Sequence, residues 1–157
     1  MDGKAPDTEK HITYLVNDYI IRHLRRIYQA SSGDLESMMV LGEIAHYNVT
    51  EGLVAKGVTP AQLDESSFRN MLKGCNTLSI SMSSGIPRET VRRKIKKLEK
   101  LGWISRNERG HLFITIAVTT DLEQMGNITF SEFLVLMQKT CELCGYIRKP
   151  AISGHDR

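Results

Sequence analysis

The sequence predicts a mainly α-helical chain with one small β-hairpin, and three observations point to this class. Apolar residues recur at helical spacings of three and four in several long segments, the first of them at residues 8–30. Strand-like patterns are confined to two short stretches, residues 103–106 and 111–116, with a turn sequence between them. The 157 residues are 41% apolar, which is enough for one domain with helical extensions and its own core.

The N-terminal segment, residues 9–56, is expected to form a helical scaffold after a disordered start at residues 1–8. Its first helix carries a broad apolar stripe. Asp34 follows a Ser-Ser-Gly break and is suited to cap a second helix. Because the stripe of the first helix is broad for one small domain, part of it is expected to face a second subunit.

The central segment, residues 57–118, is predicted to carry the function. Two short helices are expected at residues 60–64 and 67–73, the first of them opened by a Thr-Pro pair. A third short helix at residues 78–84 should end at a glycine. A longer helix at residues 87–101 follows, and the hairpin comes after it.

The C-terminal segment, residues 119–147, is predicted to end in a dimerisation helix, with a disordered tail at residues 148–157. Residues 121–126 are expected to be a connector or a single helical turn. Thr129 and Glu132 match a capping box, in which a Ser or Thr cap is followed three residues later by Glu. The last helix is therefore expected to begin at Thr129.

Charge is distributed unevenly along the chain. The net charge is +3. Residues 86–109 contain nine basic and three acidic side chains and so carry +6, which leaves −3 for the rest of the chain. A basic block on a nearly neutral protein is typical of a surface that binds a polyanion, although a solvated helix face is the simpler alternative.

The order of elements in the basic block is that of a winged helix-turn-helix. Gly85 allows the positive φ of a tight turn between two helices, and Pro87 begins the second helix. Val91 and Ile95 are spaced to pack this helix against the first. Its first turn would then project toward a DNA groove, and the hairpin would form the wing.

Residues 84–104 closely resemble the recognition element of bacterial winged-helix transcription regulators, which include the MarR, IclR and GntR groups. The matching positions are Gly85, Ile86, Pro87, Thr90, Val91, Arg93, Leu98, Gly102 and Trp103. The order of terminal and central helices also resembles that of MarR-like dimers. The resemblance implies a regulator of transcription that binds double-stranded DNA in a sequence-specific manner. Together with the broad apolar stripe of the first helix, it predicts a homodimer.

The predicted contacts fall into three sets. Base recognition is expected from the first turns of the basic helix, at Arg88, Glu89, Thr90 and Arg92. Contacts to the DNA backbone are expected from Arg93, Lys94, Lys96, Lys97, Arg106 and Arg109. The dimer interface is expected to include Ile12, Leu15, Tyr19, Ile20, Phe133 and Met137.

Other classes of function are less well supported. The sequence has no P-loop, G-x-S-x-G, H-E-x-x-H or Gly-rich nucleotide motif, so we expect no enzyme, and no metal or other cofactor. No apolar run is long enough to span a membrane. An odd number of cysteines favours the reducing cytoplasm.

Two alternatives to a DNA-binding regulator stay open. A winged helix can serve as a protein-interaction adaptor, with its basic helix bound to an acidic partner. The pair Cys141 and Cys144 is expected to be structural, but it leaves open a redox-responsive regulator. A small-molecule effector cannot be assigned from the sequence.

Overall fold

The computed structural model describes residues 5–52, residue 57 and residues 64–145. This described part is mainly helical with one small two-stranded antiparallel sheet, which confirms the predicted class of a mainly α-helical chain with a hairpin. The predicted helix at residues 60–64 lies, except for its last residue, outside the described residues, and so does the predicted tail at residues 148–157. None of the helices in the described part combines the length and the apolar character needed to cross a membrane.

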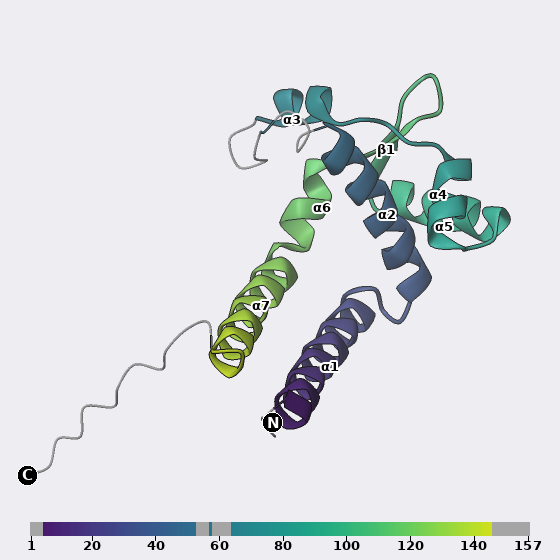
Figure 1. Cartoon of the computed structure of the whole chain (residues 1–157). Coiled ribbons are helices and arrows are strands. Elements are labelled where there is room, and N and C mark those ends of the chain that lie inside the picture. The colour runs from purple at the N-terminus through teal and green to yellow at the C-terminus, as the bar shows by residue number, and fades with distance from the viewer. Residues whose placement is uncertain (1–4, 53–56, 58–63, 146–157) are drawn as a thin grey trace, which may run out of the picture. The chain divides into compact units, whose positions relative to one another are not determined.

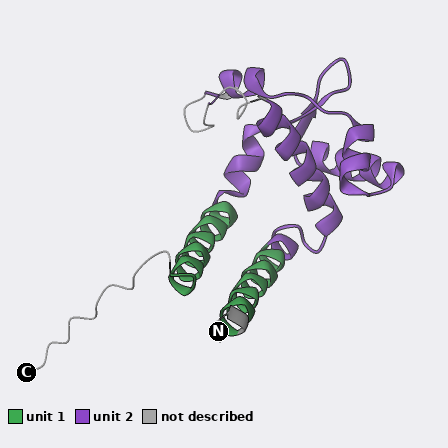
Figure 2. Ribbon diagram, in the orientation of Figure 1, with its two compact units in different colours: residues 1–26, 124–157 green, residues 27–123 purple. Residues whose placement is uncertain are grey.

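The chain divides into two compact units, which Figure 2 shows in different colours. Unit 1 consists of residues 1–26 and 124–157, and unit 2 consists of residues 27–123. All the fully buried apolar side chains of the described residues belong to unit 2. The hydrophobic core therefore lies in the unit that contains the basic block.

Unit 2 contains five helices and the hairpin, within the part of the chain that the structure describes (Figure 1). They are α2 (Leu35–Gly52), α3 (Glu65–Met71), α4 (Thr77–Ser84), α5 (Arg88–Lys100), β1 (Ile104–Arg106), β2 (Leu112–Ile114) and α6 (Ile116–Asp121). Helix α2 packs against α4, α5 and β2, and α4 packs against α5. Helix α2 is thus the central support of the basic helix α5.

Side chains before the helices set where several of them begin. Asp34 accepts a hydrogen bond from the Ser37 amide at 3.0 Å, which confirms its predicted role at the start of α2. Asp64 caps α3 by accepting from the Ser67 amide at 2.7 Å, so this helix begins slightly earlier than predicted. Asn76 caps α4 in a reciprocal box with Ser79.

The sheet is short and is tied to the segment that precedes α4. In the β1–β2 pair, Ile104 lies opposite Ile114 and Arg106 opposite Leu112. Cys75 forms an isolated antiparallel bridge with Leu112, with main-chain hydrogen bonds of 3.3 and 2.8 Å. The hairpin is therefore held by the packing of β1 against α5 and by the bridge from β2 to Cys75, which lies two residues before α4.

One buried amide links three parts of unit 2. The Asn48 side chain, on α2, is fully buried. Its Nδ2 donates to the carbonyl oxygens of Lys73, at 2.7 Å, and Leu112, at 3.1 Å. Its Oδ1 accepts from the Ile114 amide at 2.8 Å. Asn48 thereby provides hydrogen-bond partners for main-chain groups that pack against α2, and it fixes β2 against α2.

Unit 1 is formed by most of α1 (Ala5–Ala30) and α7 (Glu123–Leu143). Helix α1 begins within the predicted disordered start, at Ala5, and has Asp7 in its first turn, where a negative charge is favourable. Its side chains meet those of α7 in polar contacts. His23 Nδ1 lies 3.2 Å from the Thr129 hydroxyl, and Arg26 pairs with Glu132 at 2.8 Å.

Three predictions for the C-terminal half are wrong. Residues 121–126 are not a connector or a single helical turn, because α6 runs to Asp121 and α7 begins at Glu123. Residues 111–116 do not all form a strand: β2 ends at Ile114, and Ile116 begins α6. Thr129 does not cap the last helix, because α7 begins six residues earlier, at Glu123, and Thr129 lies inside it. The side chains of the apparent capping box are engaged by α1 instead, through contacts that sequence spacing does not reveal.

Candidate nucleic-acid interface

The turn between α4 and α5 is fixed by hydrogen bonds from serine side chains. Gly85 ends α4 in the left-handed conformation, with φ of 69°, which strains any residue that has a Cβ. The Ser81 hydroxyl donates to the Ile86 carbonyl at 2.8 Å, and the Ser84 hydroxyl accepts from the Ile86 amide at 3.2 Å. Because Ile86 is also buried, the turn sets the position of the first residues of α5.

Helix α5 has one fully buried face and one exposed basic face. The buried face consists of Val91, Ile95 and Leu98. Successive residues of a helix are about 100° apart, so the side chains that point away from this buried face can be identified. They include three exposed basic residues, here called the basic face: Arg93, Lys96 and Lys100. The geometry thus presents three cations on one side of a helix whose other side is fixed in the core.

The N-terminus of α5 is open. Pro87 occupies the cap position and makes no side-chain cap hydrogen bond. Arg88 and Glu89 are exposed in the first turn, whereas Thr90 is half-buried. The first amides of a helix have no partner within it and attract anions, so this end of α5 is suited to a phosphate group.

The tip of the hairpin is a tight turn held by an asparagine side chain. The Asn107 side chain accepts from the amides of Arg109, at 3.1 Å, and His111, at 2.9 Å. Arg106 Nε pairs with Glu99 Oε1 at 3.0 Å, which ties the hairpin to α5. Arg106, predicted to contact DNA, is therefore partly neutralised within the chain, while Arg109 is exposed at the tip.

Two of the lysines predicted to contact DNA meet acidic side chains at the start of α2. Lys94 Nζ lies 2.6 Å from Asp34 Oδ1 and 3.1 Å from Glu36 Oε2. Lys97 Nζ lies 2.8 Å from Asp34 Oδ2. Sequence analysis missed this arrangement because Asp34 is 60 residues from Lys94, and only its role as a cap could be predicted locally.

The ion pairs shift the pKa values of Asp34 and Lys94. Burial alone would raise the pKa of the Asp34 carboxyl, but hydrogen bonds from Lys94, Lys97 and Ser37 outweigh it and hold this pKa well below its usual range. The hydrogen bond to Asp34 raises the pKa of Lys94. Both shifts favour the charged forms of Asp34 and Lys94 at neutral pH.

The residues predicted to contact DNA therefore fall into two groups, those that form ion pairs with acidic side chains and those that do not. Lys94, Lys97 and Arg106 pair with acidic residues, and Arg92 pairs with Glu89 within α5 at 3.4 Å. In the described part of the chain, no ion pair is formed by Arg88, Arg93, Lys96, Lys100 or Arg109. Lys100 was not among the predicted contacts, although its spacing of seven residues from Arg93 places it on the same side of the helix.

The residues predicted at a dimer interface lie in unit 1. Ile12, Leu15 and Tyr19 are half-buried, and Ile20, Phe133 and Met137 are exposed. Tyr19 and Phe133 already meet within one chain, with ring centroids 6.1 Å apart. Helix α7 has no buried residue, and an exposed apolar stripe runs along it at Phe130, Leu134 and Met137.

The three cysteines are unpaired and differ in exposure. Cys75 is buried in unit 2, and burial raises the pKa of its thiol to about 11. Cys141 is half-buried and Cys144 is exposed near the end of α7. Among the described residues, no three potential ligands are grouped to hold a metal ion.

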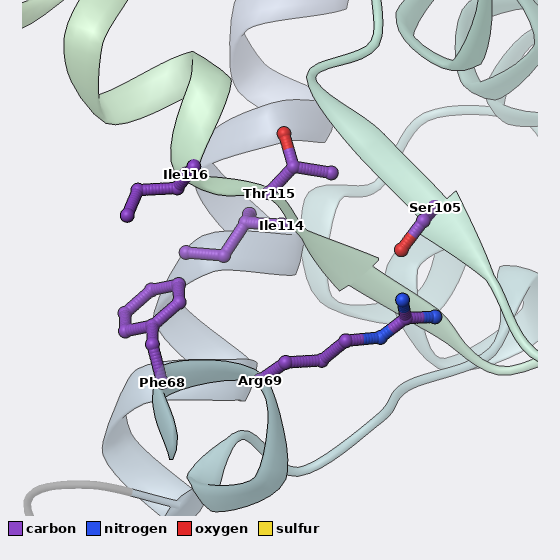
Figure 3. A pocket seen from close by; sticks show the side chains of 6 residues that line it. All are labelled: Phe68, Arg69, Ser105, Ile114, Thr115 and Ile116. Carbon is purple, nitrogen blue, oxygen red and sulfur yellow. The ribbon is translucent and has the colours of Figure 1, made fainter. Parts of the chain in front are cut away.

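A small hollow lies between α3 and the hairpin in unit 2. Its lining, shown in Figure 3, consists of Phe68, Arg69, Ser105, Ile114, Thr115 and Ile116. The hollow has a volume of about 80 Å³, far below the several hundred Å³ typical of small-molecule sites. It does not favour an effector site.

No protein-family model, curated protein or solved structure matches the chain. The resemblance of residues 84–104 to winged-helix regulators therefore stays a prediction from the sequence.

Proposed function

We propose that the protein is a winged helix-turn-helix regulator that binds double-stranded DNA in a sequence-specific manner. Helices α4 and α5, joined by the tight turn at Gly85, would form the helix-turn-helix, and β1 and β2 the wing. The bridge between Cys75 and Leu112 supports this assignment, because it fixes the hairpin beside the segment that leads into α4. In this proposal α5 lies in the major groove and the wing contacts backbone or minor groove.

The observation that carries the proposal is the basic face of α5. Its cations are exposed, are not neutralised by acidic residues in the described part of the chain, and stand on a helix whose opposite face is fully buried. Such an array suits the regular spacing of phosphates along a duplex. The open N-terminus of α5 would place Arg88 and Glu89 at base edges.

Two substitutions on α5 test the division between base and backbone contacts. We expect Arg88→Ala to weaken binding to a selected site by about 1 to 3 kcal/mol and to relax the preference at one base pair. Lys96→Ala should weaken binding to selected and random duplexes nearly alike. It should also reduce the salt slope by about 1 for each bound protomer. Fluorescence anisotropy titrations over a salt series measure both effects.

Lys10→Ala is the control for loss of one positive charge, because Lys10 is exposed on α1 in the other unit. We expect it to leave both affinity and salt slope close to wild type. Equal losses on selected and random DNA for Arg88→Ala would rule out its assignment to base recognition. Equal losses for Lys10→Ala and Lys96→Ala would contradict the role of the basic face.

We further propose that the regulator is a homodimer held by unit 1. In the described residues, unit 1 contains no buried apolar side chain, yet α7 exposes Phe130, Leu134 and Met137 along one stripe. Exposed apolar surfaces of this kind are typical of protein interfaces. A dimer would present two copies of α5 to successive turns of the DNA.

A charge introduced into the stripe tests the dimer. Met137→Glu should shift the protein from twice 17.7 kDa toward 17.7 kDa in sedimentation equilibrium, because the carboxylate would be desolvated at the interface. The matched control is Lys139→Glu, two residues on and on the opposite side of α7, which should leave the mass unchanged. A wild-type protein that is monomeric at all concentrations would contradict the proposal.

A further inference from the structure

Asp34 presents its carboxylate to two lysines of α5 at once. Each of its oxygens accepts from one of them, Lys94 at 2.6 Å and Lys97 at 2.8 Å. The carboxylate is itself held in place, because the Ser37 amide and hydroxyl donate to it at 3.0 and 2.7 Å. A fixed anion with two lysine donors is the arrangement that a DNA phosphate would offer to the same side chains.

The two lysines differ in how free they are to leave Asp34. The Lys94 side chain is 13% exposed and is also paired with Glu36, so it is confined between α2 and α5. The Lys97 side chain is 48% exposed and pairs with Asp34 alone among the described residues. Lys97 can therefore reach an external phosphate if its bond to Asp34 is given up, whereas Lys94 serves to hold α5 on α2.

We propose that Asp34 competes with the DNA backbone for Lys97 and thereby limits the affinity of the protein for DNA of any sequence. The inference rests on the proposed DNA-binding function. Binding that ignores sequence depends on the number of cations that neutralise phosphates, so a lysine held by Asp34 lowers binding to all sequences.

The variant that tests this inference is Asp34→Asn. Asparagine caps helices as well as aspartate does, so the start of α2 is preserved while the charge is removed. We expect affinity for a random duplex to rise about 3- to 10-fold near 0.1 M salt, and the salt slope to steepen by about 1 per bound protomer. The ratio of affinities for selected and random DNA should stay close to wild type, because a contact to the backbone contributes alike to both.

Glu51→Gln is the matched control. It removes one negative charge from the same helix, at a position about 25 Å along α2 from Asp34 and paired with Lys73. We expect it to change neither affinity nor salt slope. The double variant Asp34→Asn/Lys97→Ala should lose the gain of Asp34→Asn, because the released lysine is then absent.

The outcomes separate the inference from the function on which it rests. If wild-type protein binds no duplex, both fail. If wild-type protein binds DNA but Asp34→Asn binds random duplex with unchanged or lower affinity, only the inference is overturned. The inference is also overturned if the double variant Asp34→Asn/Lys97→Ala keeps the increased affinity of Asp34→Asn for random duplex.

A comparison of two neighbouring lysines tests whether Asp34 holds Lys97 away from DNA, even if the Asp34→Asn variant does not fold. Lys96 is unpaired in the described structure, whereas Lys97 is neutralised by Asp34. Lys96→Ala should therefore flatten the salt slope by about 1 per bound protomer, and Lys97→Ala by much less. Equal changes in the two variants would overturn the inference.

Discussion

Replacing Asn48 with leucine is expected to lower the free energy of unfolding of unit 2 by about 2 to 4 kcal/mol. Leucine has the same branching and number of side-chain heavy atoms as asparagine but cannot form hydrogen bonds. The variant would leave the Lys73 carbonyl and the Ile114 amide without the partner that Asn48 provides. The Leu112 carbonyl is less affected, because it also accepts from the Cys75 amide.

Urea unfolding followed by tryptophan fluorescence measures this loss. The chain has a single tryptophan, Trp103, which lies in unit 2 and donates to Asp121 at 2.7 Å. The control is Asn70→Ala, at an exposed position on α3, which should change stability by less than about 0.5 kcal/mol. A leucine variant as stable as wild type would show that Asn48 does not fix β2 to α2.

The second large effect is expected from Leu98→Ala on α5. Leu98 is fully buried between the helices of unit 2, and removing its side chain would leave a cavity. Substitutions of this kind lower the free energy of unfolding by about 2 to 5 kcal/mol. The same urea titration should show the midpoint moved to lower concentration, with a similar slope.

Leu101 provides a matched comparison for Leu98. It lies just after α5 and is 50% exposed. Because less of its surface is removed from water, Leu101→Ala should lower stability by less than about 1 kcal/mol. Similar losses in the two variants would contradict the placement of Leu98 in the core.

Local chemistry explains why α5 and its turn could be predicted from the sequence. Gly85 and Pro87 mark the turn and the start of the helix, and apolar residues at helical spacing mark its buried face. These signals act within a few residues of one another. The second strand was predicted too long because Ile116 suits either a strand or a helix when only its neighbours are considered.

Contacts between distant segments explain what sequence analysis missed. The pairing of Asp34 with Lys94 and Lys97 joins residues that are 60 and 63 positions apart. Thr129 has the spacing of a capping residue, but its hydroxyl meets His23, which is 106 positions away. Asn48 carries no local sign that it will be buried and hydrogen-bonded to β2.

The proposed sequence-specific binding is tested most directly by selecting sites from a library of random duplexes. Affinities for selected and unselected DNA would then be compared across a salt series. We expect a shared sequence motif, selected sites bound at least about 10³-fold more tightly, and a steep salt dependence for both kinds of DNA. A steep salt dependence with no preferred motif, or no binding near physiological salt, would contradict sequence-specific recognition by α5.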